Sequence, residues 1–231
     1  MKSFIGIIFV LLMYLNPQGN LNDSSPEQIA TSEGYNGLSR EERLMDAVRY
    51  YRSLGFFKQY AKLSDQELFQ QLDKQLKADW KEGTDPFSPN LDYGYEDFAD
   101  LYLLAYDTER VWLEDTEADV GPGNEVYIET LKQWAGISGG VFNPANIKET
   151  WSGTEGTAKI EYTLNRTKWT LQPEYLNDFI DVSIIKGINE SIKKSGKHFG
   201  VIVIDQMVFV ALLTAEEKQK IEDERGFKFA F

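Results

Sequence analysis

Val208-Phe209-Val210-Ala211-Leu212-Leu213 is apolar at every position, and Val201-Ile202-Val203-Ile204 shows the same pattern a few residues earlier. Successive side chains of a β-strand point to opposite faces of its sheet, so a strand that is apolar throughout requires packing on both faces. The two segments therefore predict the central strands of a sheet that is covered on both sides.

The chain around these strands indicates a hairpin and two helices. Apolar and polar residues alternate in 160–164 and again in 168–171, with Asn165-Arg166 between them, which is typical of a β-hairpin. Asp181 is placed to cap a helix that stops near Gly196, and Thr214 opens a short helix that ends near Gly226. The predicted order from residue 160 is β-β-α-β-β-α, which favours a small antiparallel or mixed sheet with helices packed on it.

The chain before residue 137 carries helical signals instead. Ser39 and Ser64 each begin a capping-box sequence ahead of apolar residues at helical spacing, and residues 98–105 and 124–135 continue the helical pattern. The sequence therefore predicts an α+β fold. Residues 39–231 are expected to form a single α+β domain, with a mostly helical part at 39–136 and a β-rich part at 137–231.

The N-terminus has the features of a targeting segment. Lys2 precedes an apolar run from Phe4 to Leu15, which has the length of a signal-peptide core and is too short to span a bilayer as a helix. Residues 1–20 are expected to be a signal peptide or, since no pair of small residues marks a cleavage site, an uncleaved anchor. Residues 21–38 are polar and small and predict a flexible tether. We therefore expect an exported protein, with membrane contact only through an uncleaved N-terminal segment.

The composition excludes several classes of function. The 37 acidic residues exceed the 24 basic ones, and the net charge of −13 repels nucleic acid and favours basic partners or cations. No cysteine is present, which excludes disulfides, Cys-ligated zinc and a thiol nucleophile. There is no phosphate-binding glycine motif, the glycines at 136–140 indicate a turn, and packing explains the single His198 better than catalysis. No catalytic residue, metal ligand or cofactor is assigned.

The densest charged feature is the segment 107–119, DTERVWLEDTEAD. If it were helical, Asp115 and Asp119 would lie one turn apart, and Arg110 would be able to pair with Asp107 or Glu114. The segment lacks the glycine of a calcium-binding loop, and a solvated face, a partner-binding face and a metal or acid–base site all stay open. The expected partner is a basic protein surface, and the candidate partner-binding residues are Asp107, Glu109, Trp112, Glu114, Asp115, Glu117 and Asp119.

Two resemblances bear on function. A family of bacterial proteins with no established activity is similar in Asp107 to Asp119, Val126-Tyr127, Leu131, Trp134, Ile137-Ser138, 142–144, Ile147, 149–151 and Leu171 to Asp181. In size, acidity and α+β character the chain also resembles bacterial immunity proteins. That resemblance implies charge-complementary binding of a toxin and transfers no functional residue.

These observations give three hypotheses. The first is an exported, non-catalytic protein-binding module, located in the periplasm, in the cell envelope or outside the cell. The second is an envelope hydrolase that uses two carboxylates, with Trp112 stacking on a sugar ring. The third is a structural component of the envelope.

Overall fold

The computed structural model describes residues 37–80, 84–88, 98–153 and 156–231. The expected signal peptide or anchor at residues 1–20, and the expected tether at 21–38 except for its last two residues, lie outside the described residues. Within the described part of the chain, no helix is both long and apolar enough to cross a membrane.

The apolar segment at 208–213 forms the middle of an antiparallel sheet. It belongs to β6 (Met207–Thr214), which pairs with β1 (Val111–Asp115) on one side and with β5 (Lys197–Ile204) on the other. The central position predicted for 208–213 is confirmed. The segment 201–204 lies instead in β5 at the sheet edge, where Val203 is 55% exposed.

The two faces of β6 pack against different halves of the molecule. Phe209, Ala211 and Leu213 lie in one apolar cluster, with the helices of the N-terminal part. The residues that alternate with them, Val208, Val210 and Leu212, lie in a second cluster on the other face. Alternation along one strand therefore joins two cores through a single sheet.

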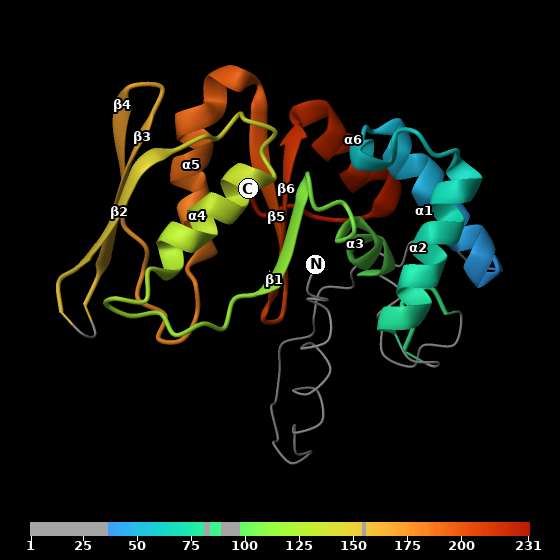
Figure 1. The fold of residues 1–231 in the computed structure, drawn as a ribbon, viewed down its shortest axis with the longest axis horizontal. Coiled ribbons are helices and arrows are strands. Elements are labelled where there is room, and N and C mark those ends of the chain that lie inside the picture. Colours follow the sequence, from blue (N-terminus) through green and yellow to red (C-terminus); the bar gives the residue numbers. More distant parts are fainter. Residues whose placement is uncertain (1–36, 81–83, 89–97, 154–155) are drawn as a thin grey trace, which may run out of the picture.

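The first face is covered by α1 (Arg40–Ser53), α2 (Asp65–Asp79), α3 (Ala99–Leu104) and α6 (Ala215–Arg225), to the right of the sheet in Figure 1. Three of these helices start where their sequences predict. The side-chain hydroxyls of Ser39, Ser64 and Thr214 each accept a hydrogen bond from the backbone N–H of the third helical residue. That residue is a glutamate in all three helices, and its carboxylate accepts a hydrogen bond from the backbone N–H of the capping residue. A short 3-10 turn, η4 (Lys58–Tyr60), follows α1.

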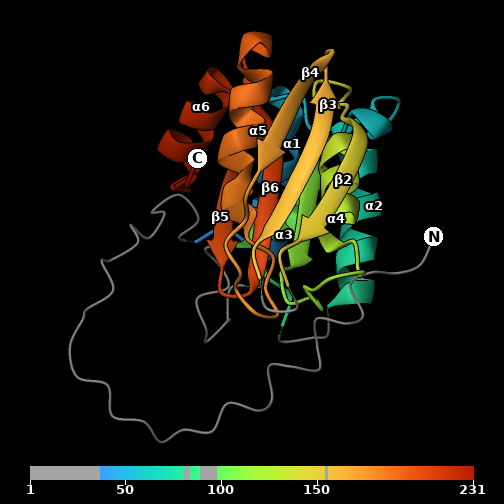
Figure 2. The ribbon, with the colours of Figure 1, turned by 90° about the vertical axis from the view of Figure 1, so that its left-hand side faces the viewer.

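The second face is covered by α4 (Val126–Gly136) and α5 (Ile185–Ile192), which lie between the first sheet and a second one (Figures 1 and 2). The second sheet has the antiparallel order β2 (Ala145–Trp151), β3 (Ala158–Leu164) and β4 (Thr167–Leu171). Asn165 and Arg166 connect β3 to β4 with φ of 50° and 65°, as a tight hairpin turn requires. The 3-10 turns η6 (Val182–Ile184) and η7 (Lys193–Ser195) flank α5.

The fold is α+β, as the sequence predicts. The predicted order β-β-α-β-β-α is present as β3-β4-α5-β5-β6-α6, distributed over two antiparallel sheets. Two strands were not predicted. β1 lies within the part expected to be mostly helical, and β2 contains a register shift between Ala145 and Lys148 that interrupts its alternation.

Candidate functional site

The acidic segment 107–119 is not helical, so the helical spacing considered for it does not apply. It begins with a turn in which Val111 N donates to Asp107 O at 2.9 Å, and it then forms β1 at the edge of the first sheet. Beyond β1, the amide of Ala118 donates to Asp178 O, and the carbonyl of Thr116 accepts from Ile180 N. These bonds fix the segment along its length.

Two of the seven candidate residues lie in the interior. Asp107 is 1% exposed and Trp112 is 6% exposed. The indole of Trp112 donates to Gln133 Oε1 at 2.7 Å and meets Trp134 edge-to-face, with ring centroids 5.8 Å apart. Trp112 therefore packs in the core, where its ring is not available to stack on a sugar as the hydrolase hypothesis supposes.

Three of the candidates form an exposed row. Asp115, Glu117 and Asp119 are exposed, whereas the residues between and after them include the buried Thr116 and Val120. This alternation of exposed and buried residues places the three carboxylates on the solvent side of the segment. We call Asp115, Glu117 and Asp119 the acidic row.

Two further acidic residues lie beside the acidic row and were not predicted. Asp178 accepts the amide of Ala118 through its backbone carbonyl. Asp205 precedes Gln206 in the turn between β5 and β6, and Gln206 O accepts from both the amide and the hydroxyl of Thr116. Both aspartates are exposed. They join the acidic row only through tertiary folding, because they are distant in sequence, and no local pattern marks them.

The remaining two candidates, Glu109 and Glu114, lie apart from each other. Glu114 is half-buried on β1, and burial together with the neighbouring Asp115 raises its pKa. Glu109 is exposed in the turn before β1 and lines a pocket that Glu114 does not reach. The structure thus separates the seven residues into an interior pair, an exposed row, a half-buried carboxyl and a pocket residue.

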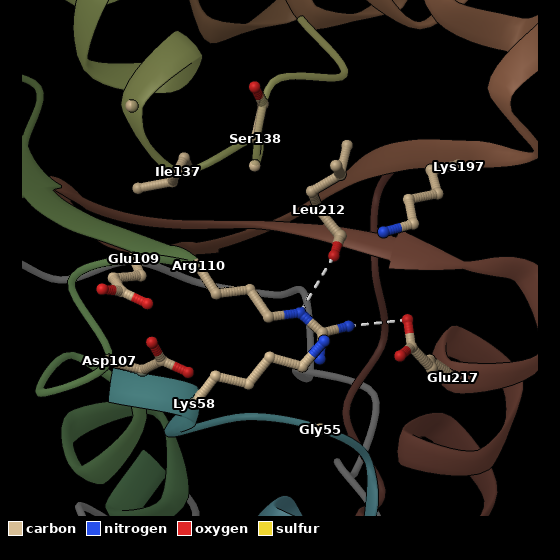
Figure 3. Close-up of a pocket in the computed structure, with 12 residues that line it drawn as sticks. Gly55, Lys58, Asp107, Glu109, Arg110, Ile137, Ser138, Lys197, Leu212 and Glu217 are labelled. Carbon is tan, nitrogen blue, oxygen red and sulfur yellow. Dashed lines mark hydrogen bonds and ion pairs between the residues drawn. The ribbon is translucent and has the colours of Figure 1, made fainter. Parts of the chain in front are cut away.

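The pocket has a volume of about 420 Å³ and lies where β1 begins and β6 ends (Figure 3). Six parts of the chain meet there, namely the loop after α1, the turn before β1, the turn after α4, the start of β5, the end of β6 and the first turn of α6. The lining residues are Gly55, Lys58, Asp107, Glu109, Arg110, Gly136, Ile137, Ser138, Gly139, Lys197, Leu212 and Glu217.

Arg110 is held in this pocket by one polar contact at each of its three guanidinium nitrogens and by an aromatic ring. Its Nη2 lies 2.6 Å from Glu217 Oε2, and its Nε and Nη1 donate to the carbonyls of Leu212 and Leu54 at 3.3 and 2.8 Å. The guanidinium also lies 4.0 Å from the ring centroid of Phe56. The expected pairing of Arg110 with Asp107 or Glu114 is thus replaced by an ion pair with a residue more than 100 positions away.

The buried carboxylate of Asp107 supports the loop after α1, which forms one wall of the pocket. Its Oδ2 accepts the amide of Phe57 at 2.6 Å, and Phe57 has a left-handed φ of 60°. Its Oδ1 is buried and makes no hydrogen bond of good geometry with the described residues. Burial raises the pKa of the Asp107 carboxyl, although the Phe57 amide and the charge of Arg110 act in the opposite direction. Because Asp107 is only 1% exposed and its Oδ2 bonds the Phe57 amide, its main role is to organise the loop at the wall of the pocket.

The glycines at 136–140 form the expected turn, and this turn is also a wall of the pocket. Gly139 has φ +56°, and a methyl group built on Gly136 or Gly139 meets nothing within 4 Å. The hydroxyl of Ser138 is already hydrogen-bonded within the turn, since it donates to Ala135 O and accepts from Phe142 N. The basic residues that the local sequence lacks come from Lys58, Arg110 and Lys197 in other parts of the chain.

His198 does not line the pocket. Burial lowers its pKa, and the charge of Lys218 acts in the same direction while Glu217 and Glu222 oppose it. The part of the chain that the structure describes contains no group of three or more His, Asp or Glu residues placed to hold a metal ion.

No protein-family model, curated protein or solved structure matches the chain.

Proposed function

We propose that the protein is a non-catalytic binding module that recognises a basic protein surface through the acidic row. The observation that carries the proposal is the exposure of Asp115, Glu117 and Asp119 on one side of an extended segment. Asp178 and Asp205 enlarge this acidic surface. Carboxylates gathered in this way attract cationic partners and accelerate their association.

The placement of the acidic row on a fixed backbone supports this role. Backbone hydrogen bonds join the segment to β6, to Gln206 in the turn between β5 and β6, and to residues 178–180. The backbone that carries the carboxylates is therefore in place before a partner binds. Such preorganisation lowers the entropy lost on binding. Export would place this surface outside the cytoplasm, where we propose that the protein acts.

The test compares two triple variants of the full chain that change the net charge equally. Asp115→Asn, Glu117→Gln and Asp119→Asn neutralise the acidic row, whereas Glu129→Gln, Glu190→Gln and Asp223→Asn neutralise exposed carboxylates elsewhere. Binding of a labelled oligolysine peptide is measured by fluorescence anisotropy over a salt series. We expect the row variant to lose affinity and most of its salt dependence, and the control to retain both.

A physiological partner is then sought by affinity capture from envelope extract with the same three proteins. A partner held by the wild type and the control, released by salt and absent from the row variant supports the proposal. Equal loss of oligolysine binding in both triple variants would show that net charge alone is responsible, and this result would contradict a specific role for the acidic row.

A further inference from the structure

The pocket in Figure 3 brings three cationic side chains together from distant parts of the sequence. Figure 3 shows the ammonium of Lys58 beside the guanidinium of Arg110, with Lys197 pointing in from β5. A methyl group at Gly55 would lie 3.7 Å from Arg110 Nη1 and 4.0 Å from Lys58 Nζ, so these two cationic groups are near neighbours. Neighbouring like charges repel each other, and an anion bound between them would offset that repulsion.

The carboxylates of the pocket do not provide that anion. Glu217 Oε2 is occupied by Arg110 Nη2 and by the amide of Thr214. Asp107 is buried and directed to the loop, and Figure 3 shows Glu109 near the backbone end of Arg110, away from the guanidinium. Among the described residues, neither Lys58 nor Lys197 has an ion-pair partner. Arg110 is paired with Glu217, whereas the charges of Lys58 and Lys197 have no such compensation in a protein whose net charge is −13.

The rest of the pocket suits a small ligand with a charged end. Gly136 and Gly139 leave open space where side chains would otherwise project, so a ligand can approach the backbone of the turn closely. Ile137 and Leu212 supply apolar lining next to the cations. Arg110 is already fixed by Glu217, two carbonyls and the Phe56 ring, which reduces the cost of ordering it around a ligand.

We propose that this pocket binds a small oxyanion, the carboxylate or phosphate group of a low-molecular-weight ligand, between Lys58, Arg110 and Lys197. Both groups accept charge-assisted hydrogen bonds from ammonium and guanidinium donors. The site is independent of the acidic row, since it consists of different residues and would bind an anion, whereas the acidic row would bind a basic protein surface.

The proposal is tested by NMR titration of the full chain with inorganic phosphate and, separately, with succinate, at an ionic strength held constant with chloride. We expect saturable shifts of the Gly136 and Gly139 amide signals, and the stronger of the two probes identifies phosphate or carboxylate as the preferred group. Lys58→Gln and Lys197→Gln should each weaken binding about tenfold, because each removes one charged hydrogen-bond donor.

Lys194→Gln is the matched control, since Lys194 is exposed, lies three residues before Lys197 and does not line the pocket. It should bind as the wild type does. Neither Lys58 nor Lys197 makes a side-chain hydrogen bond within the described residues, so all three variants should melt as the wild type does without ligand. The absence of saturable shifts with both probes at millimolar concentrations would overturn the proposal. Equal weakening in Lys194→Gln would do the same.

Discussion

Asp107 connects two loops that are 50 residues apart, and it does so from a buried position. Its Oδ2 accepts the Phe57 amide, which holds a bulky residue at φ 60°, a conformation that non-glycine residues rarely adopt. Phe57 is itself 1% exposed, so the strained backbone is fixed by packing as well as by the hydrogen bond. The lower wall of the pocket, including the position of Lys58, follows from this contact.

Replacement of Asp107 tests this role. Asp107→Asn keeps a carbonyl oxygen for the Phe57 amide and carries no charge to bury, so its unfolding free energy at neutral pH should equal or exceed that of the wild type. Asp107→Ala leaves the Phe57 amide without a partner and should cost about 1–3 kcal/mol. Urea unfolding measures both values. If Asn destabilised the protein as much as Ala, the hydrogen bond would not be the essential contact.

The sign of the pH dependence follows from the raised pKa of Asp107. Between its ordinary value of 3.8 and its higher pKa in the folded protein, the unfolded chain has lost the proton that the folded chain still binds. Stability contributed by this group therefore falls as pH rises through that window and is fully present below it. The difference in unfolding free energy, wild type minus Asp107→Asn, should accordingly decrease as the pH rises from below 3.8 to neutral. A difference that is constant with pH would contradict the assignment.

Helix α4 shows how an element can depend on a distant residue for its start. Its N-cap residue, Glu125, has φ 54° and makes no side-chain capping bond. Glu149 of β2 takes this role, since its Oε2 accepts the amides of Tyr127 and Ile128 at 3.1 and 3.3 Å. Its Oε1 accepts the indole of Trp151 at 2.8 Å. A strand carboxylate thus satisfies the helix N-terminus and joins α4 to the second sheet.

We expect Glu149→Ala to lower the unfolding free energy by about 1–2 kcal/mol, as loss of a helix cap does. Glu149→Gln keeps an acceptor but loses the favourable charge at the helix terminus, and should cost about 0.5–1 kcal/mol. Chemical denaturation gives both values. Lys148→Gln is the control, because Lys148 is exposed on the same strand and should change stability little. Equal stability of Glu149→Ala and the control would exclude the capping role.

Elements whose signals are local were predictable, and those set by tertiary contacts were not. The boxes at Ser39, Ser64 and Thr214 each lie within four residues, so sequence alone located three helix starts. β1 is short and ends in Glu114-Asp115, and only its pairing with β6 makes it a strand. The acidic row was predicted from the local concentration of carboxylates in the sequence. The pocket was not predicted, because Lys58 and Lys197 come close to Arg110 only after folding.

At the scale of the whole molecule, the first sheet unites the helical part with the β-rich part. β1 comes from residues before 137, and β5 and β6 come from residues after it. One face of β6 completes the core of α1, α2 and α3, and the other completes the core of α4, α5 and the second sheet. The pocket lies at the same junction, so its cationic residues are contributed by both parts.

This arrangement predicts that a chain divided near Gly139 cannot form two stable pieces. The N-terminal piece would keep α1, α2 and α3 but lose Phe209, Ala211 and Leu213, which pack against them. The C-terminal piece would lose β1 from the edge of its sheet and the whole of α4 from its core. We expect neither piece alone to show a cooperative thermal transition by circular dichroism, because each exposes a large apolar face to water. Mixing the two should restore a cooperative transition through pairing of β1 with β6. Independent, cooperative melting of both pieces would show that the two cores are separate domains.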